Sequence, residues 1–162
     1  MPLIKIKVDL NNFSLKVLEG NFIKIKDNFK NIIKIFGKPS EIKYIQEKIN
    51  SLKNKANIFS NIEKISNGSS GLFTVVIYND QNIKICTSVY HPTLRIFKSK
   101  NEYIITENEF LSNGTISKTS AYVKLFSHHS YFFHAGISDE AIDFLTPASS
   151  LIFKKNSKNY SS

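Results

Sequence analysis

The chain has 162 residues, of which 41% are hydrophobic, and a formal net charge of +9 at pH 7. This length suits one domain that buries a core without disulfides or metals, and no run of about 18 apolar residues is present to span a membrane. No signal peptide is recognisable at the N-terminus, and the single cysteine, Cys86, excludes an internal disulfide, so we expect a cytoplasmic protein.

Lysine carries almost all of the positive charge. Of the 22 basic residues, 21 are Lys and only Arg95 is Arg. Phosphate and base recognition favours the forked guanidinium group of Arg, and Lys, Ile and Asn together are typical of an AT-rich genome. Residues 1–100 carry a net charge of +10 and residues 101–162 a net charge of −1. We interpret the charge as a solvated lysine-rich face, with an anionic partner as the alternative.

Three short alternating segments open the chain. Residues 3–8, 13–18 and 22–26 alternate apolar and polar side chains, and Asn11-Asn12 and Glu19-Gly20 separate them. This pattern predicts three strands, which we expect to form a meander.

Helical patterns are expected next. Asp27 is a candidate cap for a helix over residues 28–36, which Gly37 would end. Ser40, after Pro39, can start a second helix with apolar residues three or four apart. Its apolar face would consist of Ile42, Ile45, Ile49 and Leu52. Residues 58–65 repeat that spacing more weakly and predict a short helix or a turn.

The stretch GLFTVVIYNDQNIKICTSVYHPTLRIF, residues 71–97, predicts consecutive strands. Residues 72–78 are almost wholly apolar, as in a strand that is covered on both faces. After a turn, residues 83–87 form the second strand of a hairpin, and Pro92 then breaks the pairing.

A second hairpin is expected from residues 94–97 and 103–106, which would complete an antiparallel meander of four strands. Ser117 or Thr119 can cap a short helix through Phe126. The segment from His128 to Phe144 is rich in aromatic residues and irregular.

Residues 151–153 predict a last strand, and residues 154–162 a polar tail that frays. With strands on both sides of a helical region, the chain is expected to be one α+β layered domain over residues 1–153, followed by the tail.

Four segments in the second half follow one another in a recognisable order. They are residues 71–80, residues 83–97, residues 103–108, and the final Phe-His-Ala-Gly-Ile of residues 133–137 with the strand to Phe153. This succession resembles the end of the glutaminase domain of asparagine synthetase-like proteins, a class II glutamine amidotransferase of the Ntn-hydrolase fold. It covers about half of the chain.

The resemblance implies a fold and a loss of chemistry. The implied fold is a layered sandwich of two antiparallel sheets between helices. The family hydrolyses glutamine with a cysteine that follows the initiator Met, and the α-amino group of the same residue acts as the base. Here Pro2 takes that position, and Ser88-Val89 align with the family's Arg-Asp turn. We therefore expect no glutaminase activity, no catalytic residue and no cofactor.

The resemblance also suggests how such a domain could act. Asparagine synthetase carries a second, ATP-consuming domain with a Gly-rich phosphate loop, and no such loop is present here. We expect a structural or regulatory subunit that contacts a synthetase-like protein or forms a homo-oligomer. The alternative is a small basic nucleic-acid-binding module, because Lys and aromatic residues interleave at residues 22–36 and 94–103.

The remaining reactive side chains are expected to be structural. His128, His129 and His134 do not match the ligand spacing of a known metal signature, so we assign no metal site, although an enzyme that uses these histidines is a third possibility. His91, before Pro92, is expected in a turn. Cys86 falls within a strand pattern and is expected to be a small buried hydrophobic residue.

Overall fold

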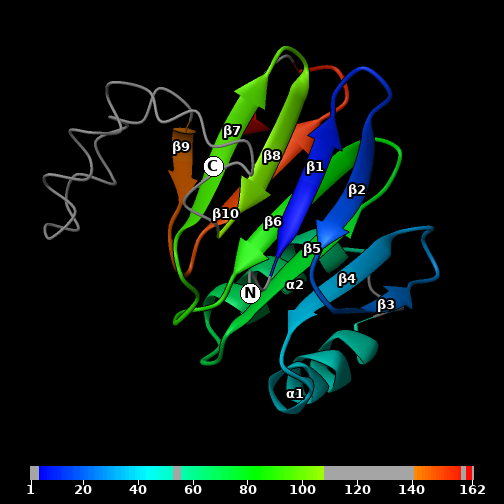
Figure 1. Cartoon of the computed structure of the whole chain (residues 1–162). Helices are drawn as coiled ribbons and strands as arrows, with labels where there is room; N and C mark the ends of the chain where they lie inside the picture. The colour runs from blue at the N-terminus through cyan, green and yellow to red at the C-terminus, as the bar shows by residue number, and fades with distance from the viewer. Residues whose placement is uncertain (1–3, 53–55, 108–140, 158–159, 162) are drawn as a thin grey trace, which may run out of the picture.

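Two antiparallel sheets and two α-helices make up the chain in the computed structural model, which describes residues 4–52, 56–107, 141–157 and 160–161 (Figure 1). The predicted α+β class is confirmed. Neither of the described helices is long and apolar enough to cross a membrane.

Sheet A has five strands, and sheet B has six. Sheet A contains, in spatial order, β2 (Ser14–Glu19), β1 (Lys5–Asp9), β8 (Glu102–Thr106), β7 (Leu94–Ser99) and β9 (Ala141–Leu145). Sheet B contains β11 (Tyr160–Ser161), β10 (Ser150–Lys154), β6 (Asn82–Thr87), β5 (Phe73–Tyr78), β4 (Ile32–Gly37) and β3 (Phe22–Lys26). Each pair of neighbouring strands is antiparallel.

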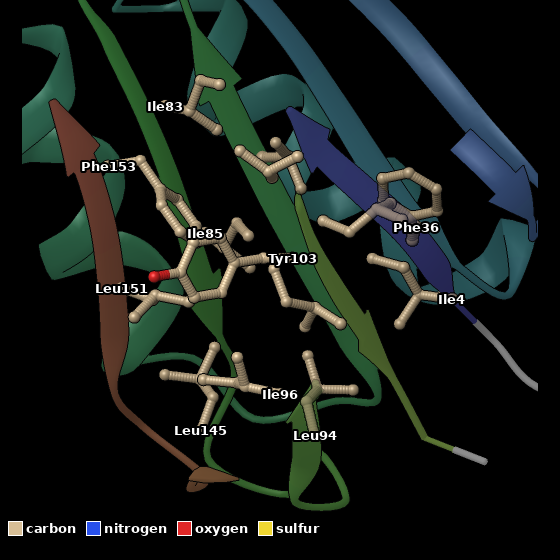
Figure 2. Packing of buried hydrophobic residues seen from close by; sticks show 14 residues of the cluster. Ile4, Phe36, Ile83, Ile85, Leu94, Ile96, Tyr103, Leu145, Leu151 and Phe153 are labelled. Carbon is tan, nitrogen blue, oxygen red and sulfur yellow. The ribbon is translucent and has the colours of Figure 1, made fainter. Parts of the chain in front are cut away.

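The main core lies between the facing sheets (Figure 2). Where a strand contributes more than one side chain, these are two residues apart, as with Ile83 and Ile85 of β6, because alternate side chains of a strand share a face. Tyr103 of β8 packs on Phe153 of β10 with ring centroids 5.1 Å apart, which joins one sheet to the other. Fourteen buried residues form this core: Ile4, Ile6, Val8, Phe36, Val76, Ile83, Ile85, Leu94, Ile96, Tyr103, Ile105, Leu145, Leu151 and Phe153.

Both helices, α1 (Pro39–Asn50) and α2 (Ile58–Asn67), cover the other face of sheet B. Pro39 stands in the first turn of α1, where its missing N–H has no partner to lose. The predicted apolar face is confirmed, since Ile42, Ile45 and Ile49 are buried against β4 and β5. The short helix predicted from residue 58 is confirmed as well.

A polar contact ties α2 to sheet B. Glu63 of α2 accepts hydrogen bonds from Lys84 Nζ of β6 and from Ser150 Oγ of β10. The Lys84 ammonium, then the Ser150 hydroxyl, lower the pKa of Glu63 from its ordinary value. The carboxylate thus links the helix to two neighbouring strands.

Strand β5 is buried on both faces, as its apolar run predicts. Val76 lies in the core between the sheets, whereas Phe73, Val75 and Ile77 lie in the core under the helices. The strands predicted at residues 3–8, 13–18, 22–26, 83–87, 94–97, 103–106 and 151–153 are confirmed within two residues at each end.

The helix predicted over residues 28–36 is wrong, because residues 32–37 form β4. Asp27 does accept N–H hydrogen bonds, from Phe29 and Asn31, but in the tight turn between β3 and β4. The side chains of β4 alternate between the two faces of sheet B, with Ile33 and Ile35 under the helices and Phe36 in the core between the sheets.

Both predicted meanders are wrong in their pairing. Strand β3 leaves β2 and pairs with β4 in sheet B. The hairpins β5–β6 and β7–β8 lie in different sheets, since the segment around Pro92 crosses from one to the other. Such a crossover lets both hairpins bury one face against each other.

Two strands of the structure, β9 and β11, were not predicted from the sequence. Ala141–Leu145 forms β9 at the edge of sheet A, and Tyr160–Ser161 pairs with β10 inside the segment expected to fray. The described residues form three layers, which are sheet A, sheet B and the two helices (Figure 1). The helix predicted from Ser117 or Thr119 to Phe126 lies outside the described residues.

Candidate functional site beneath the inter-sheet crossover

Polar side chains gather where the chain crosses from β6 to β7. Residues 88–93 leave sheet B and enter sheet A, and backbone hydrogen bonds fix this crossover. Val89 N–H donates to Ser69 O at 3.2 Å, and Ala148 N–H donates to Ser88 O at 3.1 Å. The crossover is therefore held between the loop before β5 and the loop between β9 and β10.

His91 is the centre of this cluster and is only 2% exposed. Its Nε2 lies 2.8 Å from Thr74 Oγ1 of β5 and 3.1 Å from a carboxylate oxygen of Glu107, which follows β8. Its Nδ1 lies 2.7 Å from the carbonyl oxygen of Pro92. One imidazole thus contacts both sheets and its own loop.

The contacts determine where one hydrogen of the imidazole lies. A carbonyl oxygen only accepts hydrogen bonds, so Nδ1 of His91 carries a hydrogen toward Pro92. The other ring nitrogen, Nε2, is within hydrogen-bond distance of the Thr74 hydroxyl, which can donate or accept. The same Nε2 is within ion-pair distance of the Glu107 carboxylate. A hydroxyl and a carboxylate thus meet at one nitrogen of a buried imidazole.

This arrangement differs from a nucleophile relay. In a hydroxyl–histidine–carboxylate triad, the hydroxyl and the carboxylate contact opposite ring nitrogens. Here Thr74 and Glu107 both contact Nε2 of His91. The Thr74 side chain is also fully buried, so a substrate has no access to its oxygen. The geometry suits a buried cross-link between the sheets.

Two further hydroxyls tie loops to this end of sheet B. Ser88 Oγ donates to Gly71 O at 2.5 Å and accepts from Phe73 N–H at 3.3 Å. Thr87 Oγ1 donates to Thr146 O at 2.8 Å. Side-chain hydroxyls thus replace the ladder bonds that end with the strands.

Cys86 of β6 pairs with Val75, on the other face of sheet B from Thr74, and its thiol is unreactive. It is fully buried in β6, as expected from its strand pattern. Burial raises the pKa of its thiol to about 12. A cysteine acts as a nucleophile only as the thiolate, so Cys86 is not poised for attack.

The structure describes only some of the residues that the sequence analysis considered for a functional site. Pro2 and the three histidines His128, His129 and His134 lie outside the described residues. Among the described residues, no group of His, Cys, Asp and Glu could hold a metal ion. His91 is at a bend of the chain, as predicted, but it is buried and not simply a turn residue. Thr74 and Glu107 were not singled out in the sequence, and Ser88 only as a position of the Arg-Asp turn, because no local spacing connects these three residues.

An open hollow of about 600 Å³ lies at the other end of the sheets. It is bordered by the β1–β2 turn, the β7–β8 turn and the segment after β10. Two of its lining residues are lysines and most of the others are polar. The lining consists of Leu10, Asn11, Lys98, Asn101, Lys155, Asn156 and Ser157.

No family of known proteins, curated protein or solved structure matches this chain.

Proposed function

We propose that the chain is a non-catalytic class II glutamine amidotransferase-like domain with an Ntn-hydrolase-type fold. In this proposal it acts by contact with an asparagine synthetase-like, ATP-dependent enzyme that forms amides. The stacking of the β5–β6 hairpin of one sheet on the β7–β8 hairpin of the other supports it. These are the segments that carry the sequence resemblance, and β8 pairs with the N-terminal strand β1.

The chemistry of the crossover is consistent with a domain that does not hydrolyse glutamine. Cys86 is buried with a raised pKa, and Thr74 is sealed beneath His91. Neither side chain offers a nucleophile to a substrate amide. Polar groups at this end instead connect the two sheets.

An exposed apolar pair above the cluster is the contact that we assign to the partner. Val89 and Tyr90 lie side by side in the crossover, and Tyr90 is 67% exposed. An aromatic side chain on a segment held by backbone hydrogen bonds is a good anchor, because little conformational entropy is lost on binding. The buried cluster beneath would keep this anchor in place.

Calorimetry with a separately purified synthetase-like subunit from the same organism tests the proposal. We expect a dissociation constant of about 1 µM or lower, and at least a tenfold loss of affinity for Tyr90→Ala. Tyr44→Ala is the matched control, because Tyr44 is 53% exposed on α1, away from the crossover. It should bind normally.

A second measurement concerns catalysis. The purified chain, with glutamine, should release no more glutamate than a protein-free blank. Glutamine hydrolysis by the chain, or the absence of binding to synthetase-like subunits of the organism, would overturn the proposal.

A further inference from the structure

Part of sheet B extends beyond the cover of sheet A. Phe36 of β4 belongs to the core between the sheets, but Phe22, opposite it on the edge strand β3, is 39% exposed. Side chains two residues apart on a strand share a face. This part of the sheet carries Phe22, Lys24, Lys26 and Lys34, with the partly buried Tyr78 at the border of the core, and is called here the β3–β4 basic face.

The positive charge on this face is not neutralised by the described residues. Lys24 and Lys34 are directly opposite each other on β3 and β4. Among the described residues, Lys24, Lys26 and Lys34 have no ion pair. By contrast, the lysines at positions 5, 7 and 84 are paired with Glu19, Glu102 and Glu63. Like charges placed opposite each other are unfavourable, and a bound anion would relieve them.

The pKa of Lys34 is affected by its position on this face. Partial burial, and then the charge of Lys24, lower its pKa from the ordinary value. Its ammonium lies 4.8 Å from the ring centroid of Phe22 and 5.4 Å from that of Tyr78. The cation is therefore held between two rings rather than extended into solvent.

The aromatic and basic groups have a fixed geometry. Phe22 packs at 43° on Phe36 with centroids 5.3 Å apart, so its ring is oriented by the core. The turn beside the face is fixed too, because Asn79 Nδ2 of the next turn donates to Asn31 Oδ1 at 2.8 Å. Lys24 and Lys26 are about 7 Å apart along the strand, a spacing comparable with that of neighbouring phosphates in an extended nucleic acid strand.

We propose that the β3–β4 basic face binds single-stranded nucleic acid, with phosphates at the exposed Lys24 and Lys26 and a base stacked on the exposed part of the Phe22 ring, beside the Lys34 ammonium. The combination of lysines in a row with a half-exposed ring matches the way such strands are held, by phosphate neutralisation and stacking. An acidic peptide would use the charge but not the ring. Recognition of a duplex would need an element that enters a groove. The β3–β4 basic face is a sheet surface, so it suits a single strand better than a duplex.

Fluorescence anisotropy with a labelled oligonucleotide of about 12 nucleotides tests this inference. Lys24→Gln/Lys26→Gln should weaken binding at least tenfold and reduce the slope of log affinity against log salt by about 1.4, because two phosphate contacts are lost. Lys43→Gln/Lys64→Gln removes the same charge from exposed positions on the helices. This control should change binding less than threefold.

Phe22→Leu separates stacking from charge. It keeps an apolar side chain, and we expect about a tenfold loss of affinity with an unchanged salt slope. Circular dichroism and thermal unfolding of each variant verify folding. Equal losses for both lysine pairs, absence of salt-dependent binding, or equally tight binding of poly-glutamate or of vesicles with anionic lipids would overturn the inference.

Discussion

The Nε2 atom of His91 and the hydroxyl of Thr74 lie 2.8 Å apart beneath the segment that joins the two sheets. Thr74 belongs to sheet B, whereas Glu107, the other neighbour of Nε2, follows a strand of sheet A. The histidine thus bridges layers whose other contacts in the main core are mostly apolar. Removal of this side chain should therefore lower the free energy of unfolding of the whole domain.

His91→Ala should destabilise the domain by about 3 kcal/mol, because it removes a buried imidazole that links the fully buried Thr74 hydroxyl to the partly buried Glu107 carboxylate. Urea unfolding measures this loss. His91→Gln, which retains a donor and an acceptor, should cost less. Tyr90→Ala, one residue away but exposed, should change stability by no more than about 0.5 kcal/mol. A loss below about 1 kcal/mol for His91→Ala would show that the cluster adds little.

Cys86 should be inert in the folded protein. With a thiol pKa of about 12, almost no thiolate is present at pH 8, and the side chain is buried. Ellman's reagent should therefore label native protein at least about 100 times more slowly than urea-unfolded protein. Comparable rates in the two states would contradict the placement of this thiol.

Glu63 should make stability depend on acid. Its folded-state pKa is below the unfolded value near 4.5, so its contribution is complete above that value and is lost as the pH falls through the folded-state pKa. Because its side chain is 34% exposed, solvent screening limits the effect to about 0.5 kcal/mol.

Urea unfolding of Glu63→Gln and of the unmodified chain, at pH 7 and at pH 3, measures this contribution. The difference in urea midpoint between the two proteins should be larger at pH 7. A difference that stays constant, or grows in acid, would mean that the contacts with Lys84 and Ser150 do not favour the carboxylate.

Gly37 should not tolerate a side chain. It ends β4 with φ of +153°, and an added Cβ would lie 2.8 Å from the backbone oxygen of Leu72. We expect Gly37→Ala to cost about 2 kcal/mol in chemical unfolding. Gly68→Ala, at a position with φ of −94°, should cost less. If the two substitutions cost the same, backbone conformation at Gly37 is not the limiting factor.

The local pattern of apolar residues was sufficient for an element that buries one face, such as α1, or both faces, such as β5. Helix α1 was predictable because Ile42, Ile45 and Ile49 recur at the helical period, and β5 because its apolar run is continuous. The pattern failed at residues 28–36, where Ile32, Ile33 and Phe36 satisfy the helical spacing as well as they satisfy β4. Only pairing with β3 and β5 decides between them.

Pairing between distant strands was not predictable in the same way. The separation of β6 from β7 depends on packing of one hairpin on another, which no local spacing reports. The polar cluster has the same origin, since Thr74, His91 and Glu107 meet only once both sheets have formed.

The alternation of the chain between its two sheets has a consequence for biosynthesis. Strand β1 pairs with β8, which follows it by about a hundred residues in the chain. Strand β6 pairs on one edge with β10, which is also distant in sequence. Contacts of such high sequence separation slow folding. A nascent chain that has emerged only as far as the helices therefore lacks a finished layer, and a chaperone would have most to protect at that stage.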